Sequence, residues 1–424
     1  MTKFFATNRE SLKLRWQWIA FAVALVAVVS RDASLFTHAQ FYAEDGKFWF
    51  ADAYNQGWWR PLAVPNGGYL NTLQRLIADM ALLVPFRWAP LTMNLGGLFV
   101  QVLPVPILLS ERCRSWGPLP LRLVFAAVYV GIPDAREIHV VCTNAQWHLA
   151  VAMLLLAFAP EPAHWLGKVT DLLLIAVGAV SGPFGLLLIP FVCVFWWMRR
   201  QRWTAFVLSM LACGGVVQLV MLALHHVQRN PMYLGATVER FIRLLGGNAF
   251  LGAMLGTHTY GVRFPFVVSL AALLIGLALI AYCFRFATLE VKLFLVFCFA
   301  VFAAGIRSPY FIYSPRPLWE QLLITPAQRY SFFPSLALLF AILWCALLGR
   351  RFFRMAGMLL ALITCLGIIR DWKIPSLPYK DFSQDAAVFE AAPAGTTVTL
   401  PVFPVYPDWQ MVLIKKPHDQ ETRH

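Results

Sequence analysis

The sequence predicts an all-α polytopic membrane protein, and three observations carry that prediction. Apolar residues make up 59% of the 424-residue chain, whereas a typical soluble protein has about 45–50%. Charged residues make up only 13%, against about 25% in soluble proteins, and the mean hydropathy is +0.64. The apolar residues run continuously, unlike the alternating strands of an outer-membrane barrel. These features exclude a soluble enzyme, a disordered chain and a single-span receptor.

Apolar segments of roughly spanning length follow one another along the chain. The first, 16–31, follows a basic stretch and lacks a small-residue cleavage site, so we expect an uncleaved span. Further spans are expected at 90–110, 119–133, 145–160, 168–181, 184–198, 203–225, 264–284, 288–306, 329–348 and 352–370. The sequence thus predicts about eleven transmembrane helices in a domain of residues 1–370.

The positive charges give the orientation, because Lys and Arg are held on the cytoplasmic side of a membrane. Every loop predicted inside carries at least one of them: Arg112 and Arg114, Lys168, Arg199 to Arg202, Arg285 and Lys292, and Arg350, Arg351 and Arg354. The N-terminus is therefore expected inside and the C-terminus outside. Topology also accounts for much of the net charge of +14, and since no separate basic domain appears, no nucleic-acid partner is expected.

Residues 69–86 are apolar enough to cross, but a crossing there would invert every later loop. We expect instead a helix that dips into or lies along the outer leaflet, with Arg75 and Asp79 on its polar face; a full crossing is the alternative. The short segments 168–181 and 184–198 are joined by the breaker Ser181-Gly182-Pro183, which predicts a helical hairpin.

The loops predicted outside are 32–89, 134–144, 226–263 and 307–328. Residues 371–424 are too few for a sizeable core, so we expect a small α+β cap packed on the outer ends of the spans. A helix is expected at 382–391, with strand-like alternation in 395–400 and 409–414. Most cysteines lie in apolar segments and Cys142 lacks an obvious partner, so no disulfide framework or zinc site is expected.

Two adjacent acids, Glu44 and Asp45, lie in the first outside loop. They are either a catalytic carboxylate at the membrane surface or a solvated turn that caps a helix from Lys47 to Tyr54. Adjacent side chains point in different directions, so the two acids cannot share one task. One of them would act as the base and the other would hold an Arg, a His or a metal.

The outside loops also hold candidate binding residues. Guanidinium groups suit phosphate oxygens, and the outside arginines as a set suggest an anionic ligand such as a lipid phosphate: Arg229, Arg240, Arg243, Arg263, Arg307, Arg316 and Arg329. Aromatic residues such as Trp59 and Tyr69 are either interfacial anchors or stacking surfaces for sugars. Asn144 and His148 fall one helical turn apart, with a structural histidine as the alternative. No Walker A, GxGxxG, HExxH or GxSxG motif is present.

This layout resembles the GT-C superfamily of integral-membrane glycosyltransferases, especially bacterial members that use a polyprenyl-phosphate sugar to glucosylate O-antigen. The resemblance is carried by Ala43-Glu44-Asp45-Gly46, Gly68-Tyr69-Leu70 to Arg75, Asn144 to Trp147, Gln328-Arg329-Tyr330, and Ala394 to Pro401 with Trp409. It implies a bacterial inner-membrane enzyme that transfers a hexose, on the periplasmic or extracellular face, to a lipid-linked or surface glycan. The expected base is Asp45 or Glu44; no cofactor is required, and a divalent metal is left open.

An inverting transfer needs a carboxylate base and cations that hold the leaving phosphate. The donor phosphate is assigned to Arg329, Arg75, Arg316, Arg307 and Tyr330, and the sugar or acceptor to Tyr69, Asn144, Trp147, His148 and Trp59. We favour Asp45 as the base, because Gly46 beside it would let the backbone turn closely around a sugar. A transporter or flippase for a lipid-linked sugar is the main alternative; a non-catalytic partner of a cell-wall machine is the third. Span interiors nearly free of charge favour the enzyme.

Overall fold

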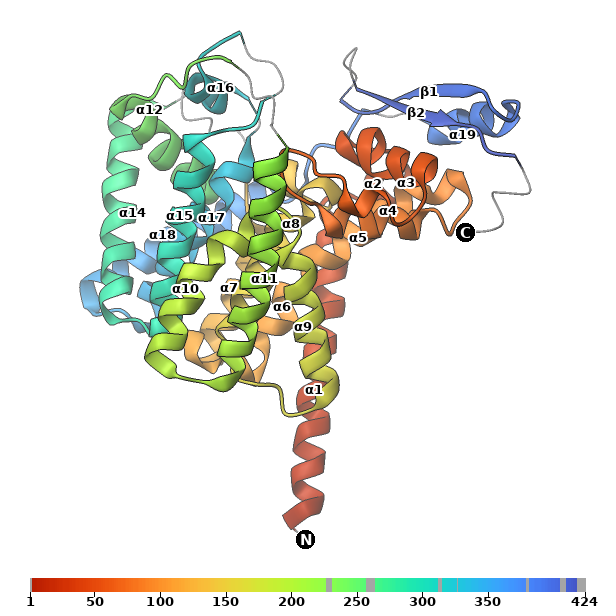
Figure 1. The fold of residues 1–424 in the computed structure, drawn as a ribbon. Coiled ribbons are helices and arrows are strands. Elements are labelled where there is room, and N and C mark those ends of the chain that lie inside the picture. Colours follow the sequence, from red (N-terminus) through yellow and green to blue (C-terminus); the bar gives the residue numbers. More distant parts are fainter. Residues whose placement is uncertain are drawn as a thin grey trace.

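The computed structural model describes residues 2–225, 231–256, 264–311, 315–325, 327–378, 381–404 and 409–417, with side chains from residue 16 onward. The chain is mostly helical and has one small two-stranded sheet near its C-terminus. Figure 1 shows a tall helical bundle and a smaller lobe at the end of the bundle opposite the N-terminus. The lobe contains α2, α3, α4, α19 and the two strands.

The long helices run between the two ends of the bundle, each beginning near the end at which its predecessor stops (Figure 1). They are α1 (Thr2–Arg31), α5 (Ala89–Val102) continued by α6 (Pro104–Leu109), α7 (Leu119–Gly131), α8 (Ala145–Ala157), α9 (Trp165–Ala179), α10 (Phe184–Arg199), α11 (Arg202–Leu224), α14 (Phe266–Phe286), α15 (Leu289–Arg307), α17 (Gln328–Leu348) and α18 (Arg351–Arg370). A helix therefore lies at every segment for which the sequence predicted a span.

Shorter elements connect the long helices. They are α2 (Ser34–Thr37), the π-helix η1 (Asp45–Phe50), α3 (Ala51–Gln56), η2 (Pro61–Ala63), α4 (Thr72–Ala81), η3 (Phe86–Trp88), η4 (Glu111–Trp116), η5 (Arg136–Ile138), η6 (Cys142–Asn144), α12 (Val238–Ile242), the π-helix η7 (Arg243–Leu251), α13 (Gly252–Leu255) and α16 (Leu318–Ile324). The short elements α2, η1, α3 and η2 lie at the lobe end of the bundle. The elements η5, η6 and α16 lie at the same end.

The bundle has the composition of a membrane domain. Within the described residues, six helices are long and apolar enough to cross a membrane: Phe86–Leu109, Arg202–Leu224, Phe266–Phe286, Leu289–Arg307, Gln328–Leu348 and Arg351–Arg370. Four apolar helices are shorter: Trp16–Arg31, Leu119–Gly131, Cys142–Ala157 and Phe184–Arg199. The transmembrane helical character that the sequence predicted is therefore present.

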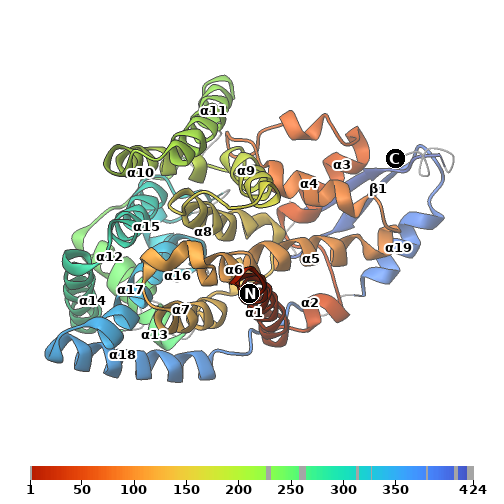
Figure 2. The same ribbon diagram turned by 90° about the horizontal axis from the view of Figure 1, so that it is seen from below.

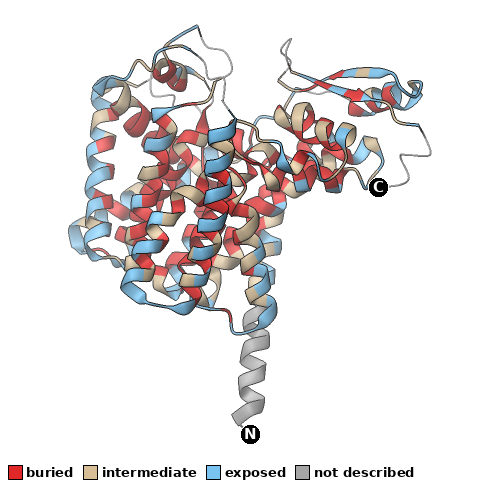
Figure 3. Ribbon diagram, viewed as in Figure 1, coloured by how far each residue is buried: buried red, intermediate tan, exposed pale blue. Residues whose placement is uncertain are grey.

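The outer surface of the bundle is apolar. On α18 the exposed side chains include Phe352, Met355, Leu359 and Ile369, and α18 lies on the perimeter of the bundle in the view from below (Figure 2). Figure 3 shows buried residues concentrated in the middle of the bundle. An apolar perimeter of this kind is unfavourable in water and favourable against lipid tails.

The loops predicted inside meet at the N-terminal end of the bundle. Arg199 pairs with Glu290 at 3.2 Å, and Thr288 Oγ1 donates to the Ser115 carbonyl oxygen at 2.8 Å. Arg112 pairs with Asp171 at 2.6 Å. Because these contacts join separate loops, the basic residues that set the predicted orientation lie at one end of the bundle.

The helix α4 corrects one expectation about residues 69–86. The segment forms only a ten-residue helix, which at 1.5 Å per residue is about 15 Å long and too short to cross. The predicted polar face points inward: Arg75 and Asp79 are buried, whereas Met80 and Leu83 are exposed. The reason is that Arg75 has an acidic partner inside the lobe, Asp52, at 3.0 Å. The helix therefore turns its apolar side outward, as lipid-facing helices do.

The hairpin of α9 and α10 is present as predicted, and its turn supports α4. Gly182 makes the turn with φ of +78°, a conformation that suits glycine, and its N–H donates to the Leu70 carbonyl oxygen at 2.8 Å. Ser181 Oγ accepts a hydrogen bond from the N–H of Leu73 at 2.8 Å. The hairpin turn thus fixes the start of the lobe.

The tail forms the predicted cap, consisting of α19 (Phe382–Ala391) and the antiparallel strands β1 (Thr397–Pro401) and β2 (Gln410–Ile414). Thr397 lies opposite Ile414 in the sheet. The cap packs on the segment between α1 and α5: Phe389 contacts Phe86, with ring centroids 4.7 Å apart. All eight cysteines fall within the described residues and are free thiols.

Candidate functional site

The acid turn, which we define as residues 41–46, places Asp45 at the start of η1. Asp45 is 1% exposed, and its Oδ1 accepts a hydrogen bond from the N–H of Thr143 at 2.7 Å. Its Oδ2 is buried and has no hydrogen-bond partner among the described residues. Glu44 is only half-buried, and its side chain makes no capping hydrogen bond at the start of η1. Asp45 is therefore more deeply buried than Glu44, and Glu44 does not form the helix cap that the sequence left as the alternative.

The second part of the site is the loop between α7 and α8. Asn144, one of the predicted acceptor residues, is buried, and its Nδ2 donates to the Glu137 carbonyl oxygen at 2.8 Å. Trp49 Nε1 donates to Thr143 Oγ1 at 2.8 Å, and Gln74 Nε2 donates to the Thr143 carbonyl oxygen at 3.1 Å. The loop is therefore bonded to both η1 and α4, which holds Asp45 in place.

The third part of the site is Arg329, in the first turn of α17. Its guanidinium group pairs with Glu137 Oε1, and its backbone N–H donates to Glu137 Oε2 at 3.0 Å. Its Nη2 donates to the Tyr310 carbonyl oxygen at 3.0 Å, and its guanidinium carbon lies 4.9 Å from the ring centroid of Tyr330. The Glu137 carboxylate thus contacts both the guanidinium group of Arg329 and the backbone of the first turn of α17. The N-terminus of a helix is a favourable position for an anion.

Electrostatic coupling joins these three parts into one cluster. Burial, and after it the charge of the neighbouring Glu44, raises the pKa of Asp45 to about 8, against hydrogen bonds from Thr143. Burial also raises the pKa of Glu44, which the charge of Arg329 opposes. The pKa of Tyr42 is raised by burial, then by Glu137 and Glu44. The site is defined here as Tyr42, Glu44, Asp45, Glu137 and Arg329. In it Arg329 pairs with Glu137 and interacts with the charge of Glu44, which is the neighbour of Asp45.

Backbone strain accompanies the cluster. Ala43, Asp134 and Val140 have φ values of +46°, +53° and +62°, in the left-handed region that non-glycine residues rarely adopt. For a β-branched residue such as Val140 this conformation is an outlier. The three residues belong to the acid turn and to the loop between α7 and α8. Strained residues of this kind persist where the surrounding structure over-determines them, often at functional sites.

The predicted aromatic and histidine residues are only partly assembled at the site. Tyr330 and Trp147 are buried and lie with ring centroids 6.4 Å apart. His148 is a correction: it is buried in α8, bonded to Tyr129 Oη at 2.7 Å and to the Ile138 carbonyl oxygen at 2.9 Å. Its ring nitrogens are used by the protein itself, so it has the structural role that the sequence left as the alternative.

Trp59 and Tyr69 lie between α3 and α4. Trp59 is 81% exposed, which fits an interfacial anchor. Tyr69 is half-buried in a turn, where its carbonyl oxygen accepts a hydrogen bond from the N–H of Asn66 at 3.0 Å.

The predicted phosphate-binding arginines separate in the same way. Arg75 is buried against Asp52 and lies 5.1 Å from the ring centroid of Trp49, because it joins α4 to α3. Arg316 is exposed beside Glu320 at 2.9 Å, and Arg307 is exposed at the end of α15. Arg229 and Arg263 lie outside the described residues. Arg329 is the member of the set that the described structure places with the acids.

Glu137 is the main residue that sequence reasoning missed. It lies 192 positions from Arg329, so no spacing along the chain relates the two. One signal was present in the sequence. The short loop predicted at 134–144 contains an acidic residue, Glu137, and Arg329 at the end of a predicted span needed an acidic partner. A partly buried arginine at the end of an apolar helix needs an anion, and Glu137 is the anion that the fold supplies.

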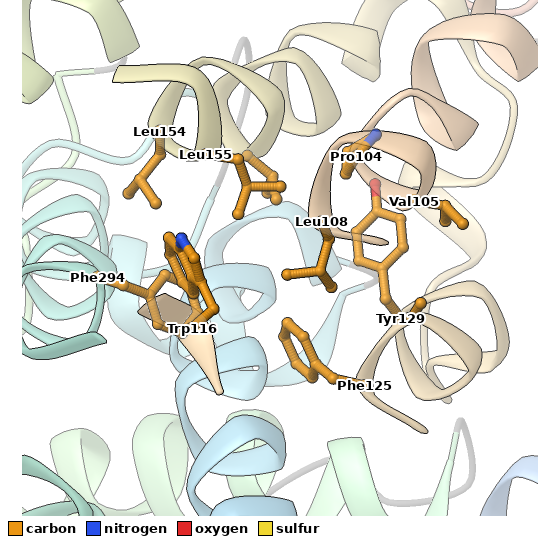
Figure 4. A pocket seen from close by; sticks show the side chains of 11 residues that line it. Pro104, Val105, Leu108, Trp116, Phe125, Tyr129, Leu154, Leu155 and Phe294 are labelled. Carbon is orange, nitrogen blue, oxygen red and sulfur yellow. The ribbon is translucent and has the colours of Figure 1, made fainter. Parts of the chain in front are cut away.

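Two small cavities lie within the bundle. One is enclosed by apolar side chains of α6, α7 and α8 with Trp116 and Phe294 (Figure 4), toward the N-terminal end and away from Asp45. The other lies beside the first turns of α17 and is lined in part by Asp134, Gln328 and Ser335. Over the described residues, no group of three or more His, Cys, Asp or Glu side chains is arranged to hold a metal ion.

No protein-family model matches this chain, and no curated protein matches it either.

Proposed function

We propose that the chain is a membrane glycosyltransferase that moves a hexose from a polyprenyl phosphate to a hydroxyl group of a lipid-linked or surface glycan. The observation that carries the proposal is the environment of Asp45. One carboxyl oxygen is fixed by Thr143, the other is buried without a partner among the described residues, and an arginine lies in the same electrostatic cluster. A base and a cation are the two groups that such a transfer needs.

In the proposed reaction the acceptor oxygen attacks the anomeric carbon of the donor sugar. A carbon–oxygen bond forms there as the bond to the phosphate oxygen breaks, and the configuration inverts. Asp45 takes the hydroxyl proton, and the lipid phosphate leaves as an anion that needs no general acid. Glu44, half-buried and within the field of Arg329, keeps the arginine oriented. Asp45 has a raised pKa near working pH, which suits a general base.

The donor phosphate is assigned to Arg329. The phosphate would take over the position that Glu137 holds at the guanidinium group and at the first turn of α17, since both are suited to an anion. Tyr330, beside the guanidinium group, would line the same position. The polyprenyl chain would lie along the apolar surface of the bundle, among membrane lipids.

The proposed location is a bacterial inner membrane, with the site on the periplasmic or extracellular face. Eleven apolar segments would cross, the shorter ones where neighbouring helices or a locally thin bilayer accommodate them. The basic loops would lie in the cytoplasm, and the acid turn and the cap outside. The O-antigen of lipopolysaccharide is the proposed class of acceptor.

Cysteine labelling tests this orientation. Gln384 is exposed on α19 and Gln201 is exposed between α10 and α11. We expect an impermeant maleimide to label Gln384→Cys in intact cells and to label Gln201→Cys only after permeabilisation. The wild-type protein, whose Cys193, Cys213 and Cys365 are exposed on apolar helices, gives the background. Labelling of Gln201→Cys in intact cells would contradict the proposed topology.

The raised pKa of Asp45 predicts the pH dependence of transfer. The base must be ionised, so kcat/KM should rise with pH and level off above about 8, the apparent value belonging to the pair with Glu44. Stability should change in the opposite direction. A carboxyl group whose folded pKa is raised stabilises the fold at low pH and loses that contribution between its ordinary pKa and about 8. Asp45→Asn should therefore flatten the fall in thermal stability between pH 5 and pH 8.

A reconstituted assay tests the proposed function against the flippase alternative. Proteoliposomes would carry a fluorescent polyprenyl-phosphate hexose, and both its leaflet distribution and its cleavage in the presence of a glycan acceptor would be followed. We expect acceptor-dependent loss of the hexose from the lipid, with no faster exchange between leaflets. Faster exchange with an intact donor would instead support the transporter.

A further inference from the structure

The C-terminal tail lies directly against the acid turn. The N–H of Ala43 donates to the Phe403 carbonyl oxygen at 2.5 Å, and the N–H of Phe403 donates to the Phe41 carbonyl oxygen at 3.4 Å. Tyr42 and Phe403 form a parallel bridge, with ring centroids 6.0 Å apart. The tail therefore pairs with the turn through a single parallel bridge immediately before Glu44 and Asp45.

Gly46 shows how closely the two segments approach. A Cβ atom at this position would lie 2.6 Å from Val402 Cγ1 and 2.9 Å from Phe41 Cβ, distances that real Cβ atoms do not show. Gly46 lies in the helical backbone of η1, where alanine would otherwise be preferred. The glycine thus allows the close approach of the cap, and its expected role of letting the backbone turn around a sugar stays a prediction.

Val402 is itself held firmly by the cap. It is buried, its N–H donates to the Trp409 carbonyl oxygen at 3.2 Å, and it directly follows β1. Lys47 Nζ, on the first turn of η1, lies 4.9 Å from the ring centroid of Trp409. The contact between the tail and the acid turn is thus backed by the β1–β2 sheet.

Asp45 is consequently supported from two sides. The Thr143 N–H fixes Oδ1, and the tail fixes the backbone on either side of the acids, at Ala43 and at Gly46. Ala43 has the left-handed φ of +46°, and its N–H is the one bonded to Phe403. The residue with the unfavourable backbone conformation is therefore the one that the tail holds by a hydrogen bond. Such a conformation persists where the surrounding structure holds it in place.

We propose that Val402 and Phe403 are positioning residues for Asp45, so that the C-terminal cap is part of the active site and not an independent appendage. The contact between the tail and the acid turn does not depend on the proposed function. The expected effect on the rate of hexose transfer does rest on it. A base misplaced by about 1 Å can lose about 10²-fold in rate. The cap therefore sets the turnover of the enzyme without touching the reacting atoms.

The test uses the full-length protein and a pair of compensating substitutions. Gly46→Ala should press on Val402 and lower kcat by about 10–10²-fold with little change in the donor KM, because the donor is assigned to Arg329. Val402→Ala removes the nearest atoms, so the double variant should recover part of the lost kcat. Gly57→Ala is the matched control: Gly57 lies in the same loop with φ of +83°, and a Cβ atom added there would meet nothing within 4 Å, so the substitution adds strain without a clash.

Hydrogen exchange of the segment 41–50, followed by mass spectrometry, makes the test independent of catalysis. We expect faster exchange there in Gly46→Ala and in the milder Val402→Ala, and wild-type exchange in Gly57→Ala apart from its own turn. Unchanged exchange in a folded Gly46→Ala, or rate losses that simply multiply in the double variant, would overturn the positioning role. If the wild-type protein transfers no hexose, the proposed function fails, and the exchange data alone then decide whether the cap holds the acid turn.

Discussion

Asp45→Asn is expected to slow hexose transfer by about 10²–10⁴-fold, the usual contribution of a general base. Asparagine keeps the shape of the side chain and can still accept the hydrogen bond from Thr143. It cannot take the acceptor proton. Donor binding should be nearly unchanged, because the phosphate is assigned to Arg329. Single-turnover rates together with donor affinity in detergent would separate the two effects.

The same substitution should stabilise the protein at pH 8. Asp45 is buried and its second carboxyl oxygen has no partner among the described residues, so the ionised form is costly to bury. A neutral amide removes that cost, so the melting temperature should rise. A change of 1 kcal/mol shifts the melting temperature by roughly 2–4 °C in a domain of 150–250 residues and by less in a longer chain such as this one. Loss of activity combined with a gain in stability is typical of a strained catalytic group.

Two comparisons sharpen the result. Glu44→Gln should reduce transfer less than Asp45→Asn if Glu44 only orients Arg329, and more if Glu44 is the base. Glu390→Gln makes the same change of charge at an exposed position of α19 and should leave the rate unaltered. If both acid-turn variants transfer hexose at the wild-type rate, the acid pair is structural and the transporter becomes the better hypothesis.

The fold was largely predictable from sequence because long apolar segments have few alternatives in a membrane. Backbone groups in lipid must be satisfied internally, so each segment becomes a helix. The tail was predictable for a different reason, since β1 and β2 alternate and α19 is bounded by turn residues. The inward orientation of Arg75 was not predictable, because a helical pattern shows that a polar face exists and not which partner it meets. Asp52, 23 positions earlier, decided it.

The site was predictable only in its local parts. Glu44 and Asp45 stand out because adjacent acids are rare in so apolar a chain, and Arg329 because it begins a span. Their grouping depends on contacts between distant segments, such as Thr143 with Asp45 and Glu137 with Arg329, which are 98 and 192 positions apart. The packing of Gly46 against Val402 was likewise not predictable, because the two residues come from distant segments of the chain.

Substitutions at Arg329 should separate phosphate binding from structural pairing. Arg329→Ala is expected to lower transfer by about 10²–10³-fold, the range for removing one donor that stabilises developing charge. Arg329→Lys should fall between it and the wild type, because lysine keeps the charge and lacks the bidentate fork. Arg240→Lys is the matched control, since Arg240 pairs with Glu320 at 3.0 Å at the same end of the bundle and is assigned no ligand.

Stability alone cannot decide the role of Arg329, because its removal leaves Glu137 buried without its partner, which is destabilising in either case. The double variant Arg329→Gln with Glu137→Gln resolves this. A neutral hydrogen-bonding pair should restore the melting temperature, and if Arg329 binds the donor phosphate, transfer should stay low. Glu137→Gln alone should lower the donor KM, since the competing carboxylate is gone and the guanidinium group remains. Recovery of both stability and transfer in the double variant would mean that Arg329 serves only to pair with Glu137, and the donor phosphate would have to be held elsewhere.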